Sequence, residues 1–411
     1  MTDYMKLTKF FYIHGATKHQ LEYEQRFNNY AAYQTGLTIH PFRKGMVENG
    51  EIELFFVHVP ELMALHEKVL ENSILIRQAV SELPKFAVEP YFHKLIVNEA
   101  QSNNEIEGVR STKEELTNIL EHLHDSKNIS RKRFVGMMKT YQFIDQLKPF
   151  TSIQDFRVLY DQLVADEVSK KKEPDGEYFR KTGVTITDGS KITHRGVEPE
   201  AKIIEKLTDL VHFLQSEAVP DLYKYFIAHY YYEYIHPFYD GNGRTGRLLV
   251  GSYVARKLER YSAITLSYTV NNDKPKYYKA LEMIANPFNK GDMTFYLIDM
   301  VELLVAGQKE LLEDLLIVLA KSKRIKEFID TLDWIENNDL KHLLHIMLDI
   351  EALATSIQPL SNTQLKNILG ISSHLLKKYL EELEARSIVR VVRKRPKTYQ
   401  IEEEFLQEIF N

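Results

Sequence analysis

Twelve residues near the middle of the chain carry the side chains best suited to chemistry. They run from His236 to Arg247 and read His-Pro-Phe-Tyr-Asp-Gly-Asn-Gly-Arg-Thr-Gly-Arg. The glycines at 241 and 243 allow positive φ and a close approach of the backbone to a ligand. A glycine-rich loop that leads into a helix is a typical anion site, because unpaired N–H groups and the helix dipole both point at the ligand.

The charged side chains of this loop fit phosphates together with a divalent cation. Arg244 and Arg247 are three residues apart in the first turn of the expected helix, so both guanidinium groups lie on one side and can bind a di- or triphosphate. Asp240 offers a hard carboxylate oxygen, the kind of ligand that Mg²⁺ takes alongside phosphates. His236 can accept a proton from a hydroxyl. The alternative is a buried histidine beside a glycine loop that merely caps a helix.

Two helices are expected to position the loop. The run from Phe226 to Ile235 has few polar residues and predicts a buried helix. It should end at His236, because a proline disfavours helical geometry in the residue before it. A second helix is expected to begin at Arg244, with an apolar face that contains Leu248, Leu249, Tyr253 and Val254.

The string resembles the Fic family motif His-Pro-Phe-x-Asp/Glu-Gly-Asn-Gly/Lys-Arg-x-x-Arg at every specified position. In that family a Ser, Thr or Tyr hydroxyl of a target protein attacks the α-phosphate of ATP, and pyrophosphate leaves. The resemblance implies that His236 is the base, that Asp240 binds Mg²⁺, and that Arg244 and Arg247 hold the β- and γ-phosphates. The implied ATP-binding run is Gly241, Asn242, Gly243, Arg244, Thr245, Gly246 and Arg247.

Two further segments resemble parts of Fic proteins. The β-rich runs 183–187 and 191–194, joined by Asp188-Gly189, predict a hairpin where Fic proteins carry a flap that can bind a target segment by strand addition. An ordinary surface hairpin is the alternative. Asn272 lies ahead of a Tyr-Tyr pair, one residue away from the family spacing, and resembles the asparagine that contacts the nucleoside.

The tripeptide Ile106-Glu107-Gly108 resembles the core of the Fic inhibitory motif. In such proteins a helix before the catalytic core brings a Glu onto the second Arg of the loop, here Arg247. An Arg engaged by a carboxylate cannot also hold a γ-phosphate, and such a pair is worth about 4 kcal/mol at ~4 Å before desolvation is subtracted. The motif has Ser or Thr where this chain has Asn103. The alternative is a helix that simply ends at Glu-Gly.

Composition limits the class of protein. The 411 residues are 44% hydrophobic, include no cysteine and carry a formal charge of -5. These values exclude a disulfide framework, a thiol nucleophile and a cysteine-bound zinc, and they give no global attraction to nucleic acid. Because we find neither a signal-peptide pattern nor an apolar run long enough to span a membrane, we expect a cytoplasmic protein without a membrane partner.

Proline and glycine positions predict the remaining N-terminal elements. Residues 1 to about 57 are expected to be irregular, apart from a short strand within 51–59. Pro60 should open a helix. Pro84 and Pro90 should separate that helix from a second one, expected from about Tyr91 to Asn103.

The last part of the chain is typical of a winged helix-turn-helix domain. A short amphipathic helix after Ser361, a turn at Gly370, a helix over 374–386 and two β-rich runs follow one another. The basic residues of the final hairpin predict DNA binding, and docking to a protein or a second copy of the chain is the alternative. These basic residues are Arg390, Arg393, Lys394, Arg395 and Lys397.

We therefore expect a mainly α fold: a Fic-type helical core with a β-hairpin flap, plus a C-terminal winged helix-turn-helix domain. The expected parts are an N-terminal region over 1–83, a catalytic domain over 84–305 with its inhibitory helix at about 91–108, a helical linker over 306–344 and the last domain over 345–411.

The expected function is transfer of AMP from ATP, with Mg²⁺, to a hydroxyl of a target protein or of the chain itself, under inhibition by Glu107. Two alternatives stay open. One is a DNA-binding regulator whose Fic core is vestigial, and the other is a Fic enzyme that acts mainly in AMP removal. The expected partners are the target protein, DNA through the C-terminal domain, and a second copy of the chain in a homodimer.

Overall fold

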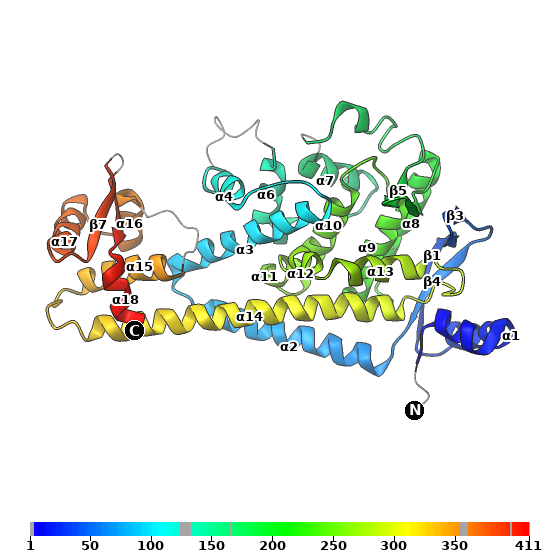
Figure 1. Ribbon diagram of the computed structural model, residues 1–411, viewed down its shortest axis with the longest axis horizontal. Coiled ribbons are helices and arrows are strands. Elements are labelled where there is room, and N and C mark those ends of the chain that lie inside the picture. The colour runs from blue at the N-terminus through cyan, green and yellow to red at the C-terminus, as the bar shows by residue number, and fades with distance from the viewer. Residues whose placement is uncertain (1–3, 124–132, 165–166, 354–360, 395–396, 411) are drawn as a thin grey trace. The chain divides into compact units, whose positions relative to one another are not determined.

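The structure is a computed structural model, and its described part is mainly helical, with small two-stranded antiparallel sheets (Figure 1). The expectation of a mainly α fold is confirmed. Among the described residues, no helix combines the length and the apolarity that a membrane span requires. The described residues are 4–123, 133–164, 167–353, 361–394 and 397–410.

The chain folds into two compact units, each made of segments from different parts of the sequence. The first consists of Met1–Ile74 and Ile96–Lys309, and the second of Leu75–Leu95 and Glu310–Asn411. The division into four parts expected from the sequence stays a prediction. The unit boundaries fall inside three long helices, which are α2 (Pro60–Glu82), α3 (Lys85–Ile106) and α14 (Thr294–Asp330).

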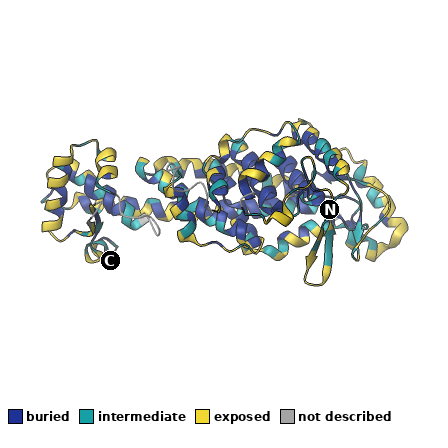
Figure 2. Cartoon of the chain, turned by 90° about the horizontal axis from the view of Figure 1, so that it is seen from above, coloured by how far each residue is buried: buried dark blue, intermediate teal, exposed yellow. Residues whose placement is uncertain are grey.

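Two consecutive helices form the centre of the first unit. Helix α9 (Asp221–Ile235) is buried at almost every position, as its apolar run predicts. Figure 2 draws buried residues in dark blue, and they lie mainly on the inner faces of the packed helices. It ends where expected, because His236 leaves the helix with a φ of 51°. Helix α10 (Asn242–Lys257) begins two residues earlier than predicted, since Gly241 at φ 79° already turns the chain into the helix.

Shorter helices surround this pair. Helix α8 packs on α9, while α7 and α11 pack on α10. The helices of the first unit that have not yet been introduced are α4 (Lys113–Glu121), α6 (Val135–Gln142), η1 (Ile144–Gln146), α7 (Gln154–Val164), η2 (Lys170–Lys172), α8 (Glu200–Gln215), α11 (Arg260–Ala263), α12 (Leu266–Asn272) and α13 (Lys274–Ile284).

The N-terminal segment is regular, so the prediction of an irregular stretch up to residue 57 is wrong. Helix α1 (Leu7–Phe27) buries few of its residues and is kinked at Gly15, which hides the helical pattern in the sequence. The other elements here are β1 (Ala32–Ile39), β2 (Phe42–Arg43), β3 (Met46–Val47) and β4 (Ile52–Val57), with β1 paired to β4 and β2 to β3.

Helix α3 begins earlier than the sequence suggests. Pro84 separates it from α2, as predicted, but Pro90 lies inside the helix, so the expected start near Tyr91 is wrong. A proline early in a helix removes one backbone hydrogen bond, which packing on neighbouring helices can offset. Helix α3 ends at Ile106 and Gly108 takes a φ of 70°, so the chain does turn away at the Glu107-Gly108 step.

The hairpin predicted before the loop is present. Strands β5 (Thr185–Asp188) and β6 (Lys191–Arg195) pair antiparallel around the Asp188-Gly189 turn. We call this hairpin the flap. Its strands bury no residue fully, so both keep contact with solvent.

The C-terminal part of the second unit contains the predicted helices and hairpin. Ser361 caps α16 through a capping box with Gln364, and Gly370 ends that helix with a φ of 66°. Buried apolar side chains such as Leu343 and Leu380 form one core across these elements. The elements are α15 (Asn338–Leu353), α16 (Asn362–Leu369), α17 (Ser373–Ala385), β7 (Val389–Lys394), β8 (Lys397–Ile401) and α18 (Glu403–Phe410), and Arg395 of the hairpin lies outside the described residues.

Candidate active site between helices α9 and α10

Asn242 ties the loop between α9 and α10 to itself. Its Oδ1 accepts a hydrogen bond from the N–H of Phe238 at 3.0 Å, and its Nδ2 donates to the carbonyl of Phe238 at 2.8 Å. The ring of Phe238 is fully buried and stacks on Tyr160 with centroids 3.7 Å apart. The side chain of Asn242, expected to contact phosphate, therefore also holds the loop in shape, a role that sequence reasoning missed.

Arg180 fixes the end of α9. Its Nε donates to the carbonyl of His236 at 2.8 Å, and its Nη2 donates to the carbonyl of Ile235 at 3.3 Å. The last carbonyls of a helix lack partners within the helix, so this buried guanidinium satisfies them and positions the histidine. Arg180 lies 56 residues before His236, and its local sequence gives no signal of this role.

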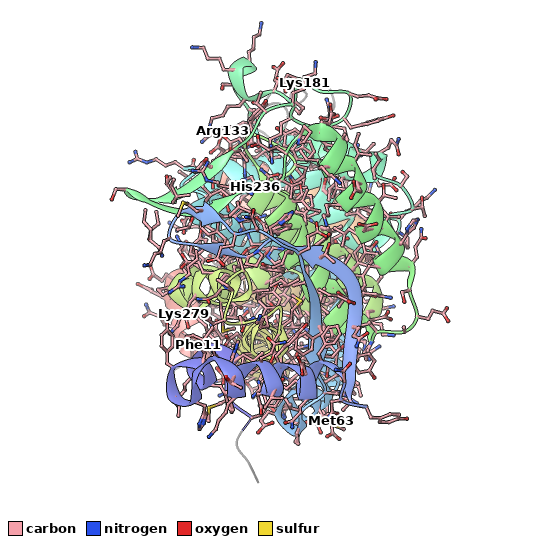
Figure 3. The ribbon with its side chains drawn as sticks, turned by 90° about the vertical axis from the view of Figure 1, so that its right-hand side faces the viewer. Phe11, Met63, Arg133, Lys181, His236 and Lys279 are labelled. Atoms are coloured by element: carbon pink, nitrogen blue, oxygen red, sulfur yellow. The ribbon has the colours of Figure 1, made fainter. Side chains whose placement is uncertain are left out.

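His236, labelled in Figure 3, directly follows the last residue of α9, and its charge state decides whether it can accept a proton. Burial, with smaller contributions from His194 and Arg180, lowers the pKa of His236 to about 3, so the ring is neutral at pH 7. The Nδ1 atom is buried and makes no hydrogen bond of normal geometry to a described residue. The backbone of Glu233 acts against burial and raises the pKa of the ring. A neutral ring with its proton on Nδ1 has its lone pair on Nε2.

The two loop glycines are required for different reasons. Gly241 has a φ of 79°, and a Cβ there would lie 2.8 Å from Cγ2 of Val164. At Gly243 a Cβ would lie 2.1 Å from Oε1 of Glu107. The Glu107 carboxylate therefore lies against the N-terminal turn of α10, at the position where a helix attracts an anion.

Arg247 is contacted from one side by the last turn of α3 and by Glu107, the residue that follows this helix. Its Nη2 donates to Oε1 of Glu107 at 2.7 Å and its Nε to Oδ1 of Asn103 at 2.7 Å. The Arg247 side chain is 1% exposed and that of Glu107 is 30% exposed. Asn103, found where the inhibitory motif has Ser or Thr, holds the same guanidinium and also donates to the hydroxyl of Tyr141. The structure thus brings together two residues that are 140 positions apart.

The segment after α7 contacts the loop through one acidic and one basic residue, each paired with a loop residue of opposite charge. Glu167 accepts from Nη1 of Arg244 at 2.6 Å, and both side chains are buried. Lys172 donates to Oδ2 of Asp240 at 2.6 Å, with both side chains partly exposed. Sequence reasoning found neither partner, because a single charged residue in a polar stretch gives no sign of what it contacts.

A second group of polar side chains lies behind the loop at Gly246. A Cβ at this glycine would lie 2.4 Å from Oε1 of Glu233 and 3.2 Å from Nδ1 of His229. Burial raises the pKa of Glu233 to about 8, although Arg247 lowers it. The glycine therefore leaves room for a carboxylic acid that is mostly protonated at neutral pH.

The two remaining residues of the predicted ATP-binding set differ in placement. Thr245 is buried and donates to the carbonyl of Gly241 at 2.9 Å, within the first turn of α10. Asn272 is exposed at the end of α12. Its neighbour Asn271, rather than Asn272, contacts α3, where it donates to Glu105 at 2.9 Å.

The carboxylate of Asp240 fits a magnesium ion that is shared with phosphates. Among the described residues, no cluster of three or more histidine or acidic side chains could hold a metal by itself. Asp240 is a single, partly exposed carboxylate, and its Oδ1 already accepts from the N–H of Gly241 at 2.8 Å. Mg²⁺ commonly binds through one or two carboxylates plus substrate phosphates, and this donor set matches that mode.

Comparison with known proteins identifies the domain that contains this loop. A model of the Fic/DOC family matches residues 149–253, which include His236, both loop arginines and the flap. The chain therefore carries a Fic/DOC domain. The match covers the middle of the first unit and leaves α3 with Glu107 outside it.

Solved structures of Fic proteins are similar to this chain. A Fic family protein from Desulfovibrio desulfuricans G20 matches with a TM-score of 0.50 and 18% identity, over 85% of this chain and 98% of that chain, which shows the shared fold. Part of Fic-1 from C. elegans matches with a TM-score of 0.43 and 19% identity, over 64% and 75% of the two chains. A Fic domain containing signaling protein from Bacteroides thetaiotaomicron matches with a TM-score of 0.43 and 19% identity, over 64% of this chain and 98% of that chain.

Proposed function

We propose that this chain is a protein adenylyltransferase that transfers AMP from ATP to a hydroxyl of a target protein or of itself. The observation that carries the proposal is a neutral His236 at the end of α9, beside the glycine-lined N-terminus of α10. Arg244 and Arg247 lie in the first turns of α10, and the carboxylate of Asp240 lies in the loop just before it. The Fic/DOC match over residues 149–253 supports the same class of enzyme.

In the proposed reaction, Nε2 of His236 takes the proton from the attacking hydroxyl. The hydroxyl oxygen forms a bond to the α-phosphorus, and the bond between that phosphorus and the oxygen bridging to the β-phosphate breaks. The electron pair of that bond leaves with pyrophosphate. Arg244 and Arg247 suit the charge on the leaving phosphates. Mg²⁺, when bound through Asp240 and the phosphates, supplies further neutralisation of that charge.

In the proposed resting state, Glu107 inhibits the enzyme. The guanidinium of Arg247 already binds Glu107 and Asn103, and Glu107 lies where the helix N-terminus would attract a phosphate. At an effective dielectric of about 20 the attraction between the two charges is on the order of 4 kcal/mol before desolvation is subtracted. Removal of Glu107 should therefore favour a productive ATP pose.

Removal of AMP from a modified protein is a second candidate function, favoured by one contact. The bond to Arg247 uses Oε1 of Glu107, which leaves Oε2 to orient a water towards an α-phosphate. The two activities differ in their response to Glu107→Gln. This change should impair AMP removal, which needs a carboxylate to activate the water, while AMP transfer should be unchanged or faster.

The C-terminal helices α16 and α17 with the β7–β8 hairpin support a proposal of DNA binding by a winged helix-turn-helix domain. Acidic neighbours reduce the positive charge of this surface: Arg390 lies 3.5 Å from Glu402 and Lys397 lies 3.7 Å from Glu384. We expect the full chain to bind duplex DNA with an affinity that falls steeply as salt rises. Fluorescence anisotropy with a labelled duplex at several salt concentrations tests this, and no binding at low salt would favour docking to a protein.

The test of the main proposal is incubation of the full chain with ATP labelled at the α-phosphate and with Mg²⁺. We expect label on the protein itself in the Glu107→Gly variant, and none when His236→Ala is added. ATP labelled at the γ-phosphate is the control, since its label should leave with pyrophosphate. Transfer of the γ-label instead would replace AMP transfer with phosphorylation.

A further inference from the structure

A groove lies between the flap and the β2–β3 hairpin. It has a volume of about 550 Å³ and is lined by the turns of both hairpins and by α13. Nε of Arg195 donates to the carbonyl of Gly45 at 3.3 Å, and the N–H of Phe42 donates to the carbonyl of Ala285 at 2.7 Å. The first bond holds the two hairpins side by side, the blue β2–β3 hairpin next to the green flap in Figure 3, and the second joins β2 to the end of α13. We call this cleft the groove.

The groove carries more positive than negative charge. Arg43, Lys44 and Lys191 line it, and Glu282 is the one carboxylate among the residues that line it. Glu282 pairs with Lys191 at 3.2 Å, and both side chains are largely exposed. The guanidinium of Arg43 lies over the ring of Phe288 at 4.6 Å, which restrains it at the groove wall. This positive charge is local, because the whole chain carries a net charge of -5.

An apolar surface adjoins the cations. Met46 is 67% exposed and Val47 is 49% exposed, both on the short strand β3 that comes directly after the groove residues. A ligand that suits this site would combine negative charge with an apolar group and would be extended, because two hairpin turns form the walls. An acidic peptide segment has these properties.

Strand β6 connects the groove to the proposed base. It begins at Lys191 in the groove, and Nε2 of His194 lies 2.7 Å from the carbonyl of Tyr234 on α9. A Cβ at Gly196, just after the strand, would lie 3.1 Å from Cβ of His236. Five residues of extended chain span roughly 16 Å, so a segment lying along β6 can fill the groove and reach the base at the same time.

We propose that the groove binds an acidic segment of the protein substrate, about five residues away from the hydroxyl that receives AMP. This inference rests on the proposed function for the identity of the substrate. It adds a sequence preference: acidic side chains, with an apolar neighbour, at a fixed distance on one side of the modified residue. The groove therefore contributes to substrate selection rather than to chemistry.

The test measures peptide binding without ATP, so that its outcome does not depend on AMP transfer. The probe is a fluorescent peptide with a central serine and a cluster of glutamates and one leucine about five residues away, and its control has glutamine for glutamate. We expect the full chain to bind the acidic peptide and to bind the neutral one at least tenfold more weakly. Lys44→Glu and Arg43→Glu should each weaken binding of the acidic peptide roughly tenfold.

Lys113→Glu is the matched control, because Lys113 is an exposed lysine of the same unit at the start of α4 and does not line the groove. Its affinity for the acidic peptide should stay within twofold of the wild type. Equal binding of the acidic and neutral peptides, or equal losses in the groove variants and in Lys113→Glu, overturns the proposal. So does displacement of the peptide by an equally charged single-stranded oligonucleotide at the same concentration, which indicates a site for any polyanion.

The two proposals can fail separately. Peptide binding at the groove with no AMP transfer to any substrate would contradict the proposed enzymatic function and would still support the groove as a docking site. If AMP transfer does occur in the Glu107→Gly background, Lys44→Glu should raise KM for the acidic peptide about tenfold and leave kcat unchanged. A fall in kcat with unchanged KM would contradict docking, and circular dichroism excludes unfolding of the variant.

Discussion

The tripeptide His-Pro-Phe occurs twice in this chain, at residues 40–42 and 236–238, and the two copies differ in their surroundings. At His40, Nδ1 lies 2.9 Å from the carbonyl of Gly50 and Nε2 lies 3.5 Å from Glu51, and 44% of the side chain is exposed. At His236 the Nδ1 atom is buried without a hydrogen bond of normal geometry to a described residue. The same three residues therefore form a partly exposed turn in one place and contain a histidine with a buried Nδ1 atom in the other.

The residues after each tripeptide explain the difference. After Phe42 the chain makes a tight turn at Lys44 and Gly45 and returns as β3. After Phe238 it enters a helix through Gly241, and Asn242 ties the turn to Phe238 through two hydrogen bonds. A base needs a fixed position and a neighbouring anion site, and only the second copy leads into a helix N-terminus.

The largest expected effect is the difference in AMP-transfer rate between two variants, each of which lacks one of the two histidines. His236→Ala should lower AMP transfer by 10²- to 10⁴-fold, the typical range for loss of a general base, because it removes the proposed acceptor of the hydroxyl proton. His40→Ala should change the rate less than twofold. Initial rates of label incorporation in the Glu107→Gly background measure both. Equal losses in the two variants would remove the distinction between the copies.

The next effect concerns the anion site that only the second copy has. Glu107→Gly should raise self-modification about tenfold or more, because Arg247 is then available to hold the γ-phosphate. Arg247→Ala in the same background should cancel the gain, and this non-additivity is the sign of a coupled pair. Rates for the wild type, both single variants and the double variant form the measurement. A folded Glu107→Gly protein that is no faster than wild type would count against inhibition by Glu107.

The pH dependence tests the buried state of the second histidine. A histidine with the ordinary pKa of about 6.5 loses its neutral form as the pH falls, so its rate drops about tenfold between pH 8 and pH 5.5. Burial lowers the pKa of His236 to about 3, so the neutral form persists through this window. We expect kcat/KM to stay within about twofold between pH 8 and pH 5.5. A tenfold drop between pH 8 and pH 5.5, with the fold intact by circular dichroism, would show that His236 titrates with an ordinary pKa.

How far the sequence predicts the site depends on the kind of interaction. The buried run of α9, the glycine turn and the flap are consequences of local patterns, and the structure contains all three. The pairing of Glu107 with Arg247 could be expected only through resemblance to a family, since no local pattern joins residues 140 positions apart.

The partners of the loop charges were not predictable. Arg180, Glu167 and Lys172 are single charged residues whose contacts depend on how distant segments pack. Helix α1 was not predicted either, because its sequence lacks a clear apolar pattern. It buries few side chains, so selection for an apolar face leaves little trace in its sequence.

A stability measurement tests whether the two hydrogen bonds between Asn242 and Phe238, in the second copy of the tripeptide, stabilise the folded protein. Asn242→Ala removes two hydrogen bonds and leaves the buried backbone N–H and carbonyl of Phe238 without those partners, which should cost about 1–3 kcal/mol. His40→Ala, at an exposed turn, should cost less than about 0.5 kcal/mol. The urea midpoints of the two variants give the comparison. A loss below about 0.5 kcal/mol for Asn242→Ala would mean that other contacts hold the loop.

The smallest expected effect concerns Asp240, which has no counterpart in the first copy. In the structure Lys172 donates to its Oδ2 at 2.6 Å, so a cation that binds Asp240 must displace this ammonium or share the carboxylate with it. The pair is partly exposed, and such pairs contribute about 0.2–1 kcal/mol, which corresponds to a factor of up to about five in affinity. Lys172→Ala should therefore tighten binding of Mn²⁺, used as a spectroscopic substitute for Mg²⁺, by two- to threefold in the presence of ATP. Electron paramagnetic resonance of free Mn²⁺ measures this directly, without reliance on turnover.

Lys172→Arg keeps the charge and should leave the affinity near that of the wild type. If Lys172→Ala instead weakens Mn²⁺ binding, the lysine helps to hold the phosphates and is no competitor of the metal.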